Sequence, residues 1–224
     1  MDFDPSPSER IASELRAHLD DALSRRDRAS AVELTLYAVH ERGLDIETLY
    51  ARVLGPLLED TGASWQQGVE RVWEEHFASA TVRTIVEGLY SDVMKESARR
   101  PRLGSVVVLA CPPGELHDLG LRMLTDRMQL AGWDAYFLGA DTPVEEIAAA
   151  AIEMRADLIA LTAATHYNRL LLREVVDRLK REAPAARVGV GGPAFSADPD
   201  WTSDEILTEC NLGLVSADDP SCEV

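Results

Sequence analysis

Apolar residues recur at helical spacing along the first hundred positions of the chain. Ile11, Leu15 and Leu19, for example, stand four residues apart, a spacing that places side chains on one face of a helix. Apolar series of this kind occupy residues 8–23, 32–39, 45–58 and 69–89. The first two series are separated near Asp27. Four helices with short connections predict a four-helix bundle, which we assign to residues 1–100.

After Pro101 the pattern changes to short, continuous apolar runs. Residues 105–110 read Ser-Val-Val-Val-Leu-Ala, which is typical of a strand buried on both faces. Further strands are predicted at 133–138, 158–162, 187–190 and 212–215, and helices at 118–130, from Pro143 onwards and at 170–181. This alternation predicts an α/β domain over residues 101–224, a Rossmann-like (flavodoxin-like) doubly wound parallel sheet. Ligands of such sheets bind at the carboxyl ends of the strands where the strand order reverses, here the first and third.

Charge and composition exclude several classes of function. The chain carries 39 acidic and 22 basic residues and a net charge of −17, so its field repels a phosphate backbone and we expect no direct nucleic-acid binding. No apolar run approaches the roughly 18 residues of a membrane span, and the N-terminus lacks a signal pattern. We therefore expect a cytoplasmic protein without membrane contact. Its three cysteines are widely separated and suggest neither a zinc site nor a disulfide framework.

The loop after the first predicted strand carries the candidate chemistry. It contains Glu115-Leu116-His117-Asp118-Leu119-Gly120. A carboxylate two residues before a histidine can hold one ring nitrogen while the other nitrogen faces a metal. Gly120 falls in the first turn of a predicted helix, where glycine costs about 1 kcal/mol relative to alanine, and a bulky planar ligand against that turn would explain the cost. In the alternative interpretation, Glu115 and His117 merely cap the helix.

Small residues end the third and fourth predicted strands. Thr162-Ala163-Ala164-Thr165 follows one, and Gly191-Gly192 closes the other. Taken singly, each segment is typical of an ordinary turn. Together, at the ligand edge of the sheet, they leave room for a cofactor tail threaded into the sheet.

At these positions the sequence resembles the cobalamin (vitamin B12)-binding domains in which a histidine displaces the lower base of the cofactor. Their signature is Asp-x-His-x-x-Gly, then Ser-x-Leu, then Gly-Gly. The resemblance implies His117 as the lower ligand to cobalt. It implies the following cofactor-binding residues: Glu115, Leu116, Asp118, Leu119, Gly120, Thr162, Ala164, Thr165, Gly191 and Gly192. Glu115 in place of Asp is similar to the light-sensing CarH branch, whereas Ala164 in place of Leu loosens the wall of the tail pocket.

The helical half strengthens this resemblance. Trp65 is followed, after nine intervening residues, by Glu75-His76, a pattern similar to the cap of CarH-type photoreceptors. The resemblance implies that Trp65 covers the upper axial group of adenosylcobalamin and that Glu75 and His76 flank it. On their own, these residues would be a core tryptophan and a solvated helix face. Gln66 stands where CarH proteins have a histidine that captures cobalt after photolysis, so a bis-histidine photoproduct of that kind is not expected.

The resemblance leads to a stand-alone, photocobilin-like light sensor. CarH proteins carry a DNA-binding module ahead of the bundle, and this chain starts almost directly at the bundle. We expect a non-enzymatic homodimer that signals to an unidentified protein partner. Some relatives pair cobalamin with a bilin such as biliverdin, and the resemblance allows a bilin as a second chromophore. The alternatives are a corrinoid protein that shuttles methyl groups, whose ligand loop differs from Pro113-Gly114-Glu115, and an interaction module without a cofactor.

Overall fold

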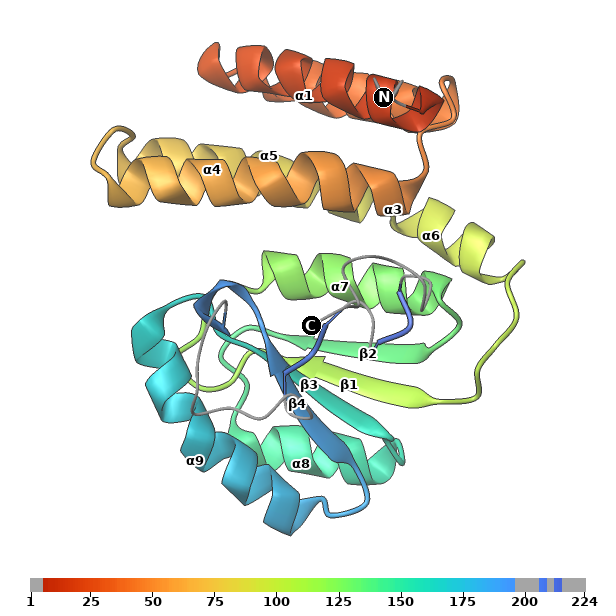
Figure 1. The fold of residues 1–224 in the computed structure, drawn as a ribbon, viewed down its shortest axis with the longest axis vertical. Coiled ribbons are helices and arrows are strands. Elements are labelled where there is room, and N and C mark those ends of the chain that lie inside the picture. Colours follow the sequence, from red (N-terminus) through yellow and green to blue (C-terminus); the bar gives the residue numbers. More distant parts are fainter. Residues whose placement is uncertain (1–5, 196–205, 209–211, 215–224) are drawn as a thin grey trace, which may run out of the picture. The chain divides into compact units, whose positions relative to one another are not determined.

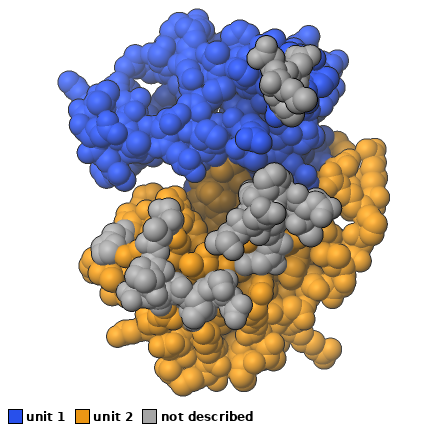
Figure 2. Space-filling model, viewed as in Figure 1, with its two compact units in different colours: residues 1–93 blue, residues 94–224 orange. Residues whose placement is uncertain are grey.

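The computed structural model describes residues 6–195, 206–208 and 212–214. The chain divides into two compact units, Met1–Val93 and Met94–Val224, drawn in two colours in Figure 2. The division falls inside a short helix, a few residues before the predicted boundary. No helix among the described residues is both long enough and apolar enough to cross a bilayer.

The first unit is helical. Its elements are α1 (Pro7–Ser24), α2 (Arg28–His40), α3 (Ile46–Leu49), the π-helical η1 (Tyr50–Leu54), α4 (Gly55–Gln66), α5 (Val72–Gly88) and the start of α6 (Tyr90–Ser97). The Asp27 side chain accepts the Ser30 N–H and so caps α2 where the sequence predicted a break. Helix α1 packs against α2 and η1, and α5 packs against α2 and α4. This ring of contacts confirms the predicted arrangement of four helical stretches (Figure 1).

The third helical stretch is longer than predicted and contains a π-helical turn. It runs through α3, η1 and α4 and ends at Gln66. Pro56 supplies the physical reason for the turn, because it has no N–H to donate to the carbonyl four residues earlier and its ring crowds that carbonyl. The Gly55 N–H instead bonds to the Tyr50 oxygen across five residues.

The second unit is a parallel sheet with helices on both faces. Its elements are β1 (Val106–Ala110), α7 (Leu119–Leu130), β2 (Asp134–Gly139), α8 (Val144–Glu153), β3 (Leu158–Thr162), α9 (His166–Glu182), β4 (Arg187–Gly191) and a short 3₁₀ turn, η2 (Pro193–Phe195). The strand order is β2-β1-β3-β4, and every pairing is parallel. This order confirms the predicted doubly wound sheet, with its reversal between β1 and β3.

Successive strand residues face opposite sides of this sheet, as the period of two requires. Val108 and Ile159 pack with residues of α8 and α9, whereas Val107 and Leu158 pack with residues of α7. Figure 1 shows α7 on one face of the sheet and α8 and α9 on the other. The near-continuous apolar runs of β1 and β3 therefore reflect burial on both faces.

Two expectations for this unit are wrong. Leu212–Leu214 form a turn around Gly213, whose φ is +70°, rather than a strand, and Val215 lies outside the described residues. Ile206 instead makes an isolated parallel bridge to Val190. The third helix of the unit begins at His166 and not at Leu170, because the Thr165 hydroxyl caps it by accepting the Asn168 N–H.

Candidate functional site

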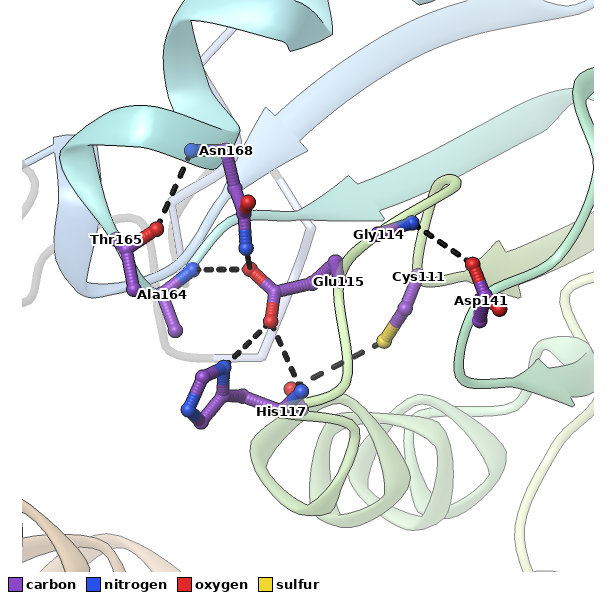
Figure 3. A network of polar contacts seen from close by, with 8 residues as sticks. All are labelled: Cys111, Gly114, Glu115, His117, Asp141, Ala164, Thr165 and Asn168. Atoms are coloured by element: carbon purple, nitrogen blue, oxygen red, sulfur yellow. Dashed lines mark hydrogen bonds and ion pairs between the residues drawn. The ribbon is translucent and has the colours of Figure 1, made fainter.

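The segments that follow β1 and β3 meet at the point where the strand order reverses. In Figure 3 the loop that carries Glu115 and His117 lies beside Ala164, Thr165 and Asn168 at the start of α9. Glu115 Oε1 lies 2.6 Å from His117 Nδ1, which confirms the predicted hydrogen bond between these side chains. The ligand edge of the sheet thus carries an imidazole held by a carboxylate.

A tight turn directs Glu115 into this position. The turn spans Pro112 to Glu115 and is closed by the Glu115 N–H, which donates to the Pro112 oxygen at 3.0 Å. Gly114 has a φ of +82°, as the third position of a type II turn requires, and Pro113 supplies the fixed φ that suits the second position. The Pro-Pro-Gly sequence therefore builds the turn that places Glu115 under the imidazole.

The Glu115 carboxylate is fully buried and is surrounded by donors. Oε1 accepts the backbone N–H of His117 at 2.9 Å, and Oε2 accepts the Ala164 N–H and the Asn168 amide, each at 2.8 Å. Burial by itself raises the pKa of a carboxyl group, but the hydrogen bonds from His117, Ala164 and Asn168 lower the pKa of Glu115 to about 2. Glu115 is therefore ionised near neutral pH.

This ionised carboxylate fixes the tautomer of His117. A carboxylate accepts hydrogen bonds only, so the Nδ1 atom beside Glu115 must carry the proton. In the neutral imidazole the lone pair then lies on Nε2, the arrangement found in metal-ligating histidines. The His117 side chain is 62% exposed while Glu115 is buried, so the ring lies at the surface and is held by a buried carboxylate. Imidazole suits a transition metal such as cobalt.

The alternative in which Glu115 and His117 cap a helix is contradicted. Helix α7 has Asp118 as its N-cap residue, without a capping hydrogen bond from that side chain, and the carboxylate of Glu115 is occupied by the donors described above. Gly120 lies in the first turn of α7, and a Cβ there would meet nothing within 4 Å. Leu116 is exposed and Leu119 is buried. The first turn of α7 beside His117 is thus open to solvent at Gly120.

The predicted small residues at the ends of β3 and β4 lie side by side. Thr162 pairs with Gly191 in the parallel register. A Cβ on Gly192, whose φ is +101°, would lie 2.5 Å from Thr162 Oγ1 and 2.7 Å from the Ala163 oxygen. Close packing of the two strand ends therefore requires glycine at position 192. Accommodation of a cofactor tail by these residues stays a prediction.

Two contributors to the site were missed in the sequence. The Ala164 backbone N–H holds Glu115, a role that no side chain reveals. Asn168 holds the same oxygen and was overlooked because α9 was predicted to begin after it. The N-cap signal of Thr165, followed three residues later by Asn168, was the available clue. Thr165 is exposed, and its hydroxyl accepts the Asn168 N–H.

The remaining predicted residues belong to the helical unit. Trp65, near the end of α4, is 45% exposed, and Gln66 is the last residue of that helix. Glu75 lies 3.5 Å from His76 Nε2 and accepts a hydrogen bond from Ser79 at 2.6 Å. Trp65 is thus a surface tryptophan and not a core one. The predicted covering of a cofactor by Trp65, Glu75 and His76 stays a prediction.

Comparisons with known proteins agree with this arrangement. Residues 105–210 match a family described as B12 binding domain, and residues 15–90 match a second family of the same description. Together the two regions cover most of the chain. The solved structure of the Methanosarcina barkeri monomethylamine corrinoid protein superposes with a TM-score of 0.72 at 18% identity, over 86% of this chain and 90% of that chain, and so shares its fold.

Curated relatives fall into two groups. The HTH-type transcriptional repressors CarA and CarH of Myxococcus xanthus are 34% and 32% identical over 53% and 65% of this chain, which spans 38% and 47% of their lengths. The dimethylamine corrinoid protein of Methanosarcina barkeri is 27% identical over 88% of this chain and 90% of its own length. These matches support cobalamin binding: the chain has B12-binding-domain matches in both its helical and its α/β unit, and it is homologous to the CarA and CarH repressors and to methanogen corrinoid proteins.

Proposed function

We propose that this protein is a cobalamin-dependent light sensor that holds adenosylcobalamin with His117 in place of the lower base. The observation that carries the cobalamin part is the Glu115–His117 pair, a surface imidazole whose Nδ1 is 2.6 Å from a buried carboxylate. Such an anchor orients the ring and raises the basicity of the opposite nitrogen. The open first turn of α7 at Gly120 and the glycines after β4 would receive the macrocycle and its tail.

Residues of the helical unit would cover the upper face of the cofactor. Trp65 offers a large rigid surface that is 45% exposed, and burial of an indole against an organic group is favourable. The carboxylate of Glu75, held by Ser79, and His76 would flank the same group with polar contacts. Ser79 is half-buried and Ala80 is exposed in α5, and side chains as small as these would let the helix approach a large ring closely.

The signal would arise from contacts that exist in one state only. When bound, adenosylcobalamin supplies a cobalt–carbon bond that visible light cleaves. Release of the upper group would remove the group that Trp65 contacts. The equilibrium between two arrangements of the two units would then shift. In this proposal the protein is a sensor and not an enzyme, and its output passes to another protein. Gln66 leaves this chain without the neighbouring histidine that CarH-type photoreceptors use.

Anaerobic illumination tests this function. Protein loaded with adenosylcobalamin in the dark should change its assembly state or its amide hydrogen exchange in α4 and α5 after green light. Free adenosylcobalamin is also photolysed, so the protein response and not the spectral change is the informative measurement. Protein loaded with hydroxocobalamin, illuminated in the same way, is the control and should not respond. The sensor function would be refuted if the adenosylcobalamin-loaded protein kept the same assembly state and the same hydrogen exchange after complete photolysis.

Replacement of Trp65 by alanine should weaken the preference for the adenosyl form. Loss of the indole contact should raise the dissociation constant for adenosylcobalamin about tenfold and leave that for hydroxocobalamin nearly unchanged. Equilibrium dialysis in the dark measures both constants. Trp73→Ala is the matched control, because Trp73 is 47% exposed and stacks with Arg26. Equal losses for the two cobalamins would contradict the role of Trp65.

A corrinoid carrier of methyl groups is the second candidate. It is favoured by the similarity to the dimethylamine corrinoid protein, because the similar region spans 90% of the length of that protein. The Glu115–His117 anchor would serve a carrier as well as a sensor. Methyl transfer from a small methylated donor to a thiol that depends on this protein would favour the carrier over the sensor.

A further inference from the structure

The ligand loop is held from a second side by the segment that follows β2. The β1–β2 pairing shifts register between Leu109 and Ala110, and its hydrogen bonds continue past the strand ends. The Cys111 N–H donates to the Gly139 oxygen, and the Thr142 N–H donates to the Cys111 oxygen, both at 2.9 Å. This extension places Asp141 directly beside the turn that carries Glu115.

Asp141 makes two hydrogen bonds to that turn. Its Oδ1 accepts the Gly114 N–H at 2.8 Å, and its own N–H donates to the Glu115 oxygen at 3.0 Å. The two bonds hold the N–H of Gly114 and the carbonyl oxygen of Glu115, and so bracket, as a clamp, the backbone from Gly114 to Glu115. Figure 3 shows Asp141 on the opposite side of the loop from Ala164 and Asn168, which hold the Glu115 carboxylate.

The conformation of Asp141 fits this role. Its φ is +49°, a left-handed value that is uncommon outside glycine and that Asp and Asn adopt more readily than other residues. The side chain is exposed, so no core packing explains a residue in this conformation. Its acceptor oxygen and its tolerance of positive φ are the two properties that the clamp uses.

We propose that Asp141 is a positioning residue for the axial histidine, which it aligns by fixing the backbone of the Gly114–Glu115 turn. Three elements would then set the direction of the imidazole: the turn itself, the α9 side through Ala164 and Asn168, and the β2 side through Asp141. This inference rests on the proposed binding of cobalamin by His117. A small displacement of Glu115 would misalign Nε2 with cobalt, since coordination depends on direction as well as distance.

Asp141→Gly removes the acceptor oxygen while keeping a residue that adopts positive φ without strain. The dissociation constant for cob(II)alamin should rise about fivefold, the value of one hydrogen bond. In protein loaded with cob(II)inamide, which lacks the nitrogenous lower base, the share of bound cobalt with a nitrogen superhyperfine coupling in its EPR spectrum should fall. In the cofactor-free protein, the Gly114 amide should exchange its hydrogen faster. Asp141→Asn keeps both the acceptor and the backbone preference, and should behave as the wild type in all three measurements.

Asp157→Gly is the matched control on the same sheet. Asp157 is exposed, and its Oδ2 accepts the Val106 N–H at 2.8 Å at the edge opposite the site. This variant should leave the cobalt spectrum and the affinity unchanged. Equal effects of Asp157→Gly and Asp141→Gly, or an Asp141→Asn variant as defective as Asp141→Gly, would overturn the proposal. If the wild-type protein shows no nitrogen coupling, the proposed function is refuted. If the wild type shows the coupling and Asp141→Gly gives the same results as the wild type, only the positioning role of Asp141 is refuted.

Discussion

His117→Ala should abolish the nitrogen coupling in the EPR spectrum of bound cob(II)inamide, which lacks the nitrogenous lower base, and weaken cobalamin binding by more than tenfold. Loss of residues that merely orient a metal ligand already costs about 10- to 100-fold in affinity, so loss of the ligand should cost at least as much. Absorption and EPR spectra of the loaded variant, with equilibrium dialysis for the affinity, measure both effects.

The same substitution should leave the fold intact. The His117 side chain is 62% exposed, and Glu115 keeps the donors from the His117 backbone, Ala164 and Asn168. A change in unfolding free energy within about 1 kcal/mol is expected for such a surface position. His40→Ala is the matched control, because His40 is also exposed and lies 3.1 Å from a carboxylate, that of Asp92. A retained nitrogen coupling in His117→Ala would remove His117 from its assigned role.

The sheet was predictable because its signals are strong and local. The apolar runs of β1 and β3, with alternating helices, admit few architectures other than a parallel sheet covered on both faces. The Glu115–His117 contact was predictable for a similar reason, since two residues so near in sequence on one tight loop have little freedom. The fifth strand was wrongly predicted from Leu212–Val215, where Gly213 turns the described part of the segment.

The rest of the site lies beyond what side-chain identity reveals. Any residue at position 164 offers the same backbone N–H, so its bond to Glu115 depends on the path of the chain alone. Asp141 stands just before the helix predicted from Pro143 onwards, and its place in the sequence does not reveal the clamp, because the clamp joins loops 27 positions apart. Asn168 was not predicted as a site residue, because the start of α9 was predicted a few residues too late. That error placed one hydrogen-bond donor of the site in a predicted loop.

Asn168→Asp should destabilise the protein by about 2 kcal/mol near neutral pH. The substitution places a second carboxylate beside that of Glu115, which is buried from water. The Asn168 amide lies 2.8 Å from Glu115 Oε2, so the substitution replaces a donor with a like charge. Denaturant unfolding of the cofactor-free protein measures the loss. Asn168→Ala is the control, since it removes the donor without adding charge and should cost about 1 kcal/mol.

The pH dependence separates repulsion from the lost hydrogen bond. In the wild type the surrounding donors lower the pKa of Glu115 to about 2. In Asn168→Asp, one of two facing carboxyl groups should acquire a folded-state pKa above its unfolded value, because a shared proton relieves the repulsion. The folded state then binds more protons than the unfolded state, so the stability deficit of Asn168→Asp should shrink as the pH falls from 7 toward 5. Asn168→Ala should show no such recovery over this range. Parallel curves of stability against pH for the two variants would contradict a contact between residue 168 and the Glu115 carboxylate. They would also contradict the buried carboxylate on which the orientation of His117 depends.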